Sequence, residues 1–403
     1  QKILLLICLK HYLNYNTMAY SFDTIISREH TNCYKYDLRS KVFGDSSVIP
    51  LWVADMDFKI ADEIIEDITK AAEHGIYGYT YFYEELYNSL IQWNARRNNW
   101  HFSASDVVFY HGIVPSLNLI IQEFTNVGDE IIVQTPVYFP FFESVEKHSR
   151  VVLNNQLVLR DGVYQIDFDA LERSISPRTK LMILCHPHNP VGRCWTHQEL
   201  MQLHDICKKH SILVVSDEIH ADILLYDNKH IPWATLSDYA RENSITLVAP
   251  SKTFNIAGLS ISAIVCQNKQ LLITIKSFIE RNQLHGMSPL NMKAFESAYT
   301  KGEQWLFELL RYLEGNLQCI REVMQQTSKI YLIEPQATYL AWLDCRNMNM
   351  TDGELQSFFV RKAGVGLSRG IQFGSGGGGF MRLNYACPRS VLLQALHQIT
   401  NAL

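Results

Sequence analysis

Seven short apolar runs between residues 107 and 266 constrain the fold of this chain more than any other feature. They are rich in β-branched side chains and lack the polar alternation of a strand with one solvated face. Helix-like segments lie between several runs, and the clearest begins with a capping box formed by Thr196 and Glu199. Strands that alternate with helices predict an α/β fold whose large domain holds a mostly parallel, seven-stranded sheet between layers of helices. The runs are VVFY (107–110), EIIVQ (130–134), VVLN (151–154), KLMILC (180–185), ILVVS (212–216), ITLVA (245–249) and SAIVC (262–266).

A change of pattern near residue 300 predicts a second, smaller α+β domain. Three further apolar runs, at 331–333, 339–344 and 382–386, alternate with helical segments at about 302–327, 352–363 and 388–401. We therefore expect a large domain over 51–300 and a small domain over 301–403. Residues 18–50 are expected to pack with the small domain. Residues 1–17 are expected to be a non-native or disordered extension, because Met18 directly precedes the first globular-looking sequence.

Composition narrows the possible partners. The formal net charge is -5, and no Lys/Arg block suggests a nucleic acid or an anionic membrane as partner. The apolar stretch Ile3 to Leu9 is much shorter than the roughly 20 residues that span a bilayer. The nine cysteines form no C-x-x-C pair and no cluster with zinc spacing, so we expect no metal site and a reducing, cytoplasmic compartment.

Polar residues follow four of the runs, at the strand ends where open α/β sheets bind ligands. After the first run, Gly112 precedes an apolar helix, with Pro115 expected as its first residue, and a helix N-terminus can bind phosphate. Asn189 lies between two prolines after the fourth run and could offer its amide to a ligand. A plain strand-to-helix turn and a turn asparagine remain alternatives for these two segments.

Asp217 and Lys252 carry charge at two further strand ends. A buried acid requires a cationic partner, which could be a pyridinium nitrogen or an ordinary Arg or Lys. A lysine in apolar surroundings has a lowered pKa and can form a Schiff base, although an exposed strand-end lysine is the commoner case. Pyridoxal phosphate (PLP) requires such a lysine, an acid, donors for its phenolic oxygen and a phosphate cradle. Together, the four strand ends predict PLP as cofactor.

The chain resembles a known enzyme family over about residues 20–401. It is similar to the fold-type I PLP enzymes of the class I/II aminotransferase superfamily, and more narrowly to the MalY/PatB-type C–S β-lyases, which are cystathionine β-lyase-like. The motifs that carry the resemblance are PLWVADMDFK (50–59), HGIYGYT (74–80), TPVYFPFF (135–142), PHNPVGR (187–193), SDEIHAD (216–222), APSKTFNIAGL (249–259) and RLNYACPR (382–389).

This resemblance implies a role for each matching residue. Lys252 holds PLP and then moves protons at Cα, Asp217 pairs with the pyridinium nitrogen, and Arg382 clamps the substrate carboxylate. The resemblance also implies that Asn189 and His220 lie near the phenolic oxygen and that Tyr138 stacks on the ring as a catalytic residue. It implies that Ile113, Val114 and Ser251 contribute to the phosphate site. Tyr79 and Tyr77 are implied to reach across a homodimer interface, Tyr79 to the partner's cofactor and Tyr77 to the substrate.

Two departures bear on the reaction. Many superfamily aminotransferases have an arginine eight residues after the lysine and a serine three residues before it, where this chain has Ser260 and Ala249. Both fit the lyase-like branch better, so we expect β-elimination of a thiol from a cysteine thioether such as cystathionine, giving pyruvate and ammonia. A PLP-dependent aminotransferase is the alternative enzyme. A PLP-bound regulatory protein acting through a protein partner is the alternative of another class.

Overall fold

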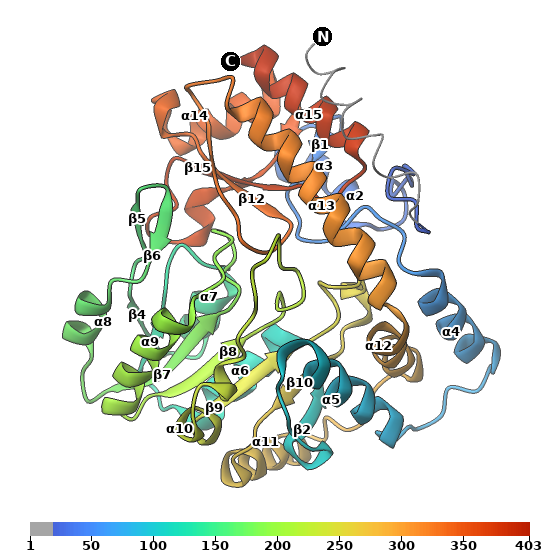
Figure 1. The fold of residues 1–403 in the computed structure, drawn as a ribbon, viewed down its shortest axis with the longest axis vertical. Coiled ribbons are helices and arrows are strands. Elements are labelled where there is room, and N and C mark those ends of the chain that lie inside the picture. The colour runs from blue at the N-terminus through green and yellow to red at the C-terminus, as the bar shows by residue number, and fades with distance from the viewer. Residues whose placement is uncertain (1–18) are drawn as a thin grey trace.

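Each of the seven apolar runs forms a strand of one sheet in the computed structural model, which describes residues 19–403 (Figure 1). The strand order is β2-β10-β9-β8-β7-β3-β4, and only β10 runs antiparallel to its neighbours. The α/β prediction is therefore confirmed. The strands are β2 (Val107–Tyr110), β3 (Glu130–Val133), β4 (Val151–Asn154), β7 (Thr179–Cys185), β8 (Leu213–Asp217), β9 (Ser244–Val248) and β10 (Ser262–Val265).

Side chains of β7 show why the runs lack polar alternation. Leu181 and Ile183 pack into a core cluster on one face of the sheet, together with residues of α6 and α11. Met182 and Leu184 pack into a second cluster on the opposite face, together with residues of α9. Since both faces are covered, both sets of alternating positions must be apolar. The α-helices between residues 62 and 301 are α4 (Asp62–Glu73), α5 (Glu84–Asn98), α6 (Ile113–Phe124), α7 (Pro140–Lys147), α8 (Phe168–Ser174), α9 (His197–Lys209), α10 (Asp238–Glu242), α11 (Lys269–Arg281) and α12 (Pro289–Lys301).

A four-stranded antiparallel sheet, ordered β11-β12-β15-β14, contains the three later runs. Its fourth strand, β14, has two residues and is too short to leave a periodic signal. The predicted helix at 352–363 is divided, because α14 ends at Ser357 and a π-helical turn follows over Phe358–Lys362. The remaining elements are β5 (Val158–Arg160), β6 (Val163–Gln165), α13 (Glu303–Met324), β11 (Tyr331–Ile333), β12 (Leu340–Asp344), α14 (Asp352–Ser357), β13 (Val365–Gly366), β14 (Ser368–Arg369), β15 (Phe380–Asn384) and α15 (Arg389–Ala402).

The segment before the large sheet is tied to the rest of the chain by charge and by pairing. Its elements are α2 (Tyr34–Asp37), α3 (Arg39–Phe43) and β1 (Ile49–Pro50), and β1 pairs in parallel with β13. Lys35 is completely buried, and its Nζ lies 2.8 Å from the Asp57 carboxylate. Arg28 binds Asp55 through both terminal nitrogens. The division into domains at residues 50 and 300 stays a prediction, and the expected extension at 1–17 lies outside the described residues.

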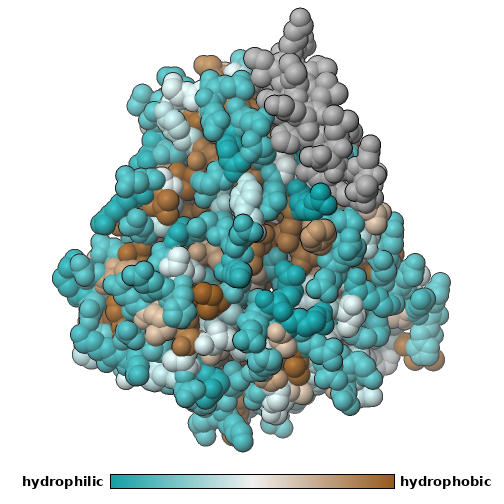
Figure 2. Space-filling model, in the orientation of Figure 1, coloured by the Kyte–Doolittle hydropathy of each residue, from teal (hydrophilic) through white to brown (hydrophobic). Residues whose placement is uncertain are grey.

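The outer surface is mainly polar. In Figure 2 hydrophilic residues cover most of the visible face, and apolar residues are interspersed among them. Within residues 19–403 no helix has the length and apolar character needed to cross a membrane.

The Lys35–Asp57 pair generates a stability prediction. We expect Lys35→Met to lower the free energy of unfolding by about 3 kcal/mol, because a buried carboxylate loses one of its cationic partners. Lys59→Met is the matched control, since it breaks an exposed pair with Asp62 and should cost less than about 1 kcal/mol. Urea denaturation of the two variants measures the difference in unfolding free energy. Equal losses of unfolding free energy would show that the buried pair contributes no more to stability than the exposed pair.

Candidate active site

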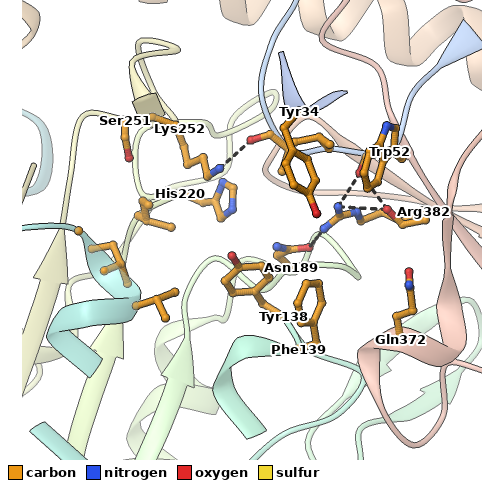
Figure 3. A pocket seen from close by; sticks show the side chains of 18 of the residues that line it. Tyr34, Trp52, Tyr138, Phe139, Asn189, His220, Ser251, Lys252, Gln372 and Arg382 are labelled. Carbon is orange, nitrogen blue, oxygen red and sulfur yellow. Dashed lines mark hydrogen bonds between the residues drawn. The ribbon is translucent and has the colours of Figure 1, made fainter. Parts of the chain in front are cut away.

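A cavity of about 620 Å³ lies at the edge of the large sheet where the carboxyl ends of its parallel strands meet (Figure 3). Residues after β2, β7, β8 and β9 line one side, and residues of the segment 34–54 and of β14 and β15 line the other. The parallel arrangement explains why residues far apart in sequence meet here. The predicted residues that line the cavity are Ile113, Val114, Tyr138, Asn189, Asp217, His220, Ser251, Lys252 and Arg382.

Lys252 follows β9 and projects into the cavity (Figure 3). Its Nζ donates a hydrogen bond of 2.6 Å to the carbonyl oxygen of Ala54. Burial lowers the pKa of Lys252 to about 8, the positive charge of Arg382 adds to this effect, and Asp55 and Asp217 oppose it. This direction agrees with the lowered pKa that the sequence predicts. Near pH 8 a large fraction of the amine is neutral and able to act as a nucleophile or a base.

Asp217 ends β8 and is buried, with an exposed fraction of 5%. Burial raises the pKa of its carboxyl to about 7, against the hydrogen bond of 3.1 Å that it accepts from the backbone N–H of Ile219. Glu218 adds to the rise, and the charge of Lys252 opposes it. Asp217 forms no ion pair with any residue in 19–403. The alternative of an ordinary salt bridge to Arg or Lys is therefore not realised, and the carboxylate is available to a cationic ligand.

Arg382 lies on β15, across the cavity from Lys252 (Figure 3). Its guanidinium donates to Asn189 Oδ1 at 3.0 Å and to the carbonyl oxygen of Trp52 at 2.9 Å, and it lies 4.8 Å from the ring centroid of Phe373. Burial lowers the pKa of Arg382 to about 10, which leaves it protonated at neutral pH. A buried guanidinium without a carboxylate beside it is suited to binding a substrate carboxylate.

Three other predicted residues surround the space between Lys252 and Arg382. The backbone N–H of Tyr138 donates to the carbonyl oxygen of Asn189 at 3.1 Å, and burial raises the pKa of the Tyr138 hydroxyl. Burial, together with the charges of Lys252 and Arg382, lowers the pKa of His220 to about 3, so its ring is neutral. The buried His220 Nδ1 has no hydrogen-bond partner among the described residues. It remains available to a ligand atom.

The start of α6 lines another part of the cavity. Gly112 is its N-cap, with a φ of +120°, and Ile113 and Val114 are its first residues. Helix N-termini leave N–H groups without intrahelical partners, and this suits an anion such as a phosphate. The expectation that Pro115 is the first helical residue is wrong, because α6 begins two residues earlier. A proline is still tolerated there, since the first turn requires no N–H from it.

Two predicted residues lie away from this cavity, and several lining residues were missed. Tyr77 and Tyr79 are exposed at 59% and 110%, and neither lines the cavity of this chain. Their role across a dimer interface stays a prediction. The missed lining residues include Tyr34, Phe43, Trp52, Phe139 and Gln372. Trp52 falls within a motif that the sequence singled out, whereas Tyr34 carries no local signal.

The residues present fit PLP. Asp217 offers a buried carboxylate without a cation of its own, and Lys252 offers an amine whose pKa is lowered to about 8 by burial. The N-terminus of α6 and Ser251 line the same cavity and can receive a phosphate. An aldehyde with a cationic ring nitrogen and a phosphate arm would therefore find a partner for each of its groups.

Comparison with known proteins gives the same cofactor. The family model described as aminotransferase class I and II matches residues 46–399. Cystathionine beta-lyase PatB of Bacillus subtilis is 40% identical over 95% of this chain and 100% of its own length. Protein MalY of Escherichia coli is 32% identical over 95% of this chain and 99% of its own. A crystal structure of cystalysin from Treponema denticola contains PLP, and its sequence is 34% identical to this chain. The match covers 96% of this chain and 99% of the cystalysin chain, with a TM-score of 0.92.

The lowered pKa of Lys252 generates a prediction about its reactivity. We expect the cofactor-free protein to bind PLP covalently at a rate that rises with pH, with a midpoint near pH 8 and a plateau at higher pH, because only the neutral amine adds to an aldehyde. Borohydride reduction followed by peptide mass spectrometry measures the rate at each pH. Lys252→Arg should give no labelled peptide at any pH. A midpoint near 10.5, the ordinary value for lysine, would contradict the effect of burial.

Proposed function

We propose that this chain, which belongs to the aminotransferase class I and II family of PLP-dependent enzymes, eliminates a thiol from the β-carbon of an L-cysteine thioether. The observation that carries the proposal is the meeting of Lys252, Asp217 and Arg382 in one cavity of a chain that is 40% identical to a cystathionine beta-lyase. Ser260, which also lines the cavity, supports elimination over transamination because many aminotransferases have an arginine there.

Each end of the cofactor has a proposed partner in this chain. Lys252 would hold PLP covalently, and Asp217 would pair with its ring nitrogen. Asn189 and His220 would bind at its phenolic oxygen, and Tyr138 would contact its ring. Ile113, Val114 and Ser251 would hold its phosphate. PLP, when bound, supplies a sink for the electron pair that remains when a bond at Cα is broken.

The protein residues then direct the reaction. The guanidinium of Arg382 binds the substrate α-carboxylate and orients Cα toward Lys252. The free Lys252 amine would take the proton from Cα as a positioned general base. Asp217 would stay ionised beside a cationic ring nitrogen and would keep that nitrogen protonated. The bond between Cβ and sulfur breaks, the thiol leaves with a proton, and hydrolysis of the remaining three-carbon fragment gives pyruvate and ammonia.

We further propose a homodimer with shared active sites and a cytoplasmic location. The exposed aromatic side chains of Tyr77, Tyr79 and Tyr81 lie on one extended segment, and such a patch is commonly an interface. In a dimer, Tyr79 would contact the cofactor of the partner subunit. Seven cysteines within residues 19–403 are free thiols, which is compatible with a reducing compartment: Cys33, Cys185, Cys194, Cys207, Cys266, Cys345 and Cys387.

Product analysis tests the reaction. With L-cystathionine or S-propyl-L-cysteine, we expect equal amounts of thiol, pyruvate and ammonia. We expect Lys252→Ala to lower kcat/KM by at least about a hundredfold, since it removes the general base. Lys269→Ala, an exposed substitution at the start of α11, is the control and should retain activity.

Two results would contradict the proposal. Formation of a keto acid that still contains the sulfur, together with pyridoxamine phosphate, would identify an aminotransferase. Survival of the biological role in Lys252→Ala would indicate a regulatory protein that does not depend on catalysis.

A further inference from the structure

Four aromatic side chains form a wall beside Arg382 in the cavity, and the proposed reaction assigns no role to them. We call Tyr34, Phe43, Trp52 and Phe139 the aromatic wall. Tyr34 and Phe43 both pack on Trp52, with ring centroids 5.4 and 5.5 Å apart. Figure 3 shows Tyr34 and Trp52 on one side of the Arg382–Asn189 pair and Phe139 on the other.

The wall is a built part of the site. The indole N–H of Trp52 donates to the carbonyl oxygen of Lys35 at 3.0 Å, and the completely buried Lys35 is paired with Asp57. The carbonyl oxygen of Trp52 in turn accepts from Arg382 at 2.9 Å. The backbone that carries Trp52 is therefore tied both to the N-terminal segment and to the proposed carboxylate site.

The position of the wall indicates what it contacts. If Arg382 binds the α-carboxylate and Lys252 faces Cα, the group attached to Cβ must occupy the rest of the same cavity. The rings of the wall line that space, and Tyr34 remains 61% exposed and Phe139 36% exposed. An apolar substituent would cover these rings and remove apolar surface from water.

The charges around the cavity also favour an uncharged substituent. Among the described residues that line it, Asp217 is the one acid, and it is reserved for the cofactor. The basic residues that line it are Lys252, Arg369 and Arg382. A substituent that ends in an ammonium group would lose water here without gaining a carboxylate partner, and it would be repelled by Arg369, since Arg382 is paired with the α-carboxylate.

We propose that the aromatic wall is the subsite for the sulfur substituent, and that it selects uncharged apolar or aromatic substituents over those that carry an ammonium group. This inference rests on the proposed elimination and specifies its substrate class. S-Alkyl and S-aryl cysteine conjugates are then better substrates than a thioether whose substituent ends in an ammonium group without a carboxylate, as in S-(2-aminoethyl)-L-cysteine.

A matched pair of substrates tests the charge preference. S-Propyl-L-cysteine and S-(2-aminoethyl)-L-cysteine have chains of equal length and differ in a terminal methyl or ammonium group. We expect kcat/KM of the holoenzyme to be at least about tenfold higher for the propyl compound. A ratio near one, or a preference for the ammonium compound through contacts with the ring faces, would overturn the proposal.

Variants of the wall test its location. Tyr34→Ser should lower the ratio of kcat/KM for S-benzyl-L-cysteine to that for S-methyl-L-cysteine by about tenfold, because only the large substituent reaches the ring. Within residues 19–403 the Tyr34 side chain packs on Trp52 and forms no hydrogen bond, and it is 61% exposed, so the fold should tolerate this change. Phe307→Ser, at an exposed position on α13, is the control and should leave the ratio unchanged. An unchanged ratio in Tyr34→Ser would exclude the wall as the subsite.

Failure of the proposed reaction remains distinguishable from failure of this inference. If no substrate releases a thiol, elimination is wrong, but the preference can still be measured by binding. L-2-Aminoheptanoate and L-lysine are the carbon analogues of the matched pair, and their affinities follow from changes in the absorbance of bound PLP. Tighter binding of the aminoheptanoate by at least about tenfold supports the apolar subsite, and equal affinities overturn it.

Discussion

The buried ion pair between Lys35 and Asp57 holds together the parts of the molecule on which the site depends. It fixes the N-terminal segment against residues 52–57, and two backbone carbonyls of this stretch face the cavity. The carbonyl oxygen of Ala54 accepts from Lys252 and from the hydroxyl of Tyr339, and the carbonyl oxygen of Trp52 accepts from Arg382. Two of the three charged residues of the proposed mechanism are therefore oriented by one short piece of backbone.

Neighbouring contacts keep this stretch in place from other directions. The side-chain amide of Asn384 donates to the carbonyl oxygens of Val53 and Asp55, both at 2.6 Å. Asn255, three residues after Lys252, exchanges hydrogen bonds with the backbone of Met56. Small shifts of the stretch would move the acceptors of Lys252 and Arg382 together, and positioning at this scale strongly affects catalytic rates.

Electrostatics divide the cavity into two regions. At the ends of β8 and β9, burial raises the pKa of Asp217 and lowers the pKa of Lys252, so burial makes the charged form of each group less favourable. On the opposite side, Arg382 remains charged among aromatic rings and backbone carbonyls. This division matches the proposed mechanism, in which proton transfer takes place in one region and the substrate carboxylate is bound in the other.

The sequence by itself determined the seven strands of the large sheet and the polar residues that follow them. A strand buried on both faces needs a continuous apolar run, and the end of that run can be seen in the local sequence. It also indicated Asp217, Asn189 and Lys252 before any relative was considered. Only the tertiary structure decided that Arg382, 193 residues from Asn189, lies within 3.0 Å of it, and that Tyr34 and Phe43 complete the cavity. Arg382 was expected solely from the family resemblance. Tyr34 was not expected, because nothing in its own segment indicates a site residue. Contacts of that kind depend on how separate elements pack, and no local period in the sequence records them.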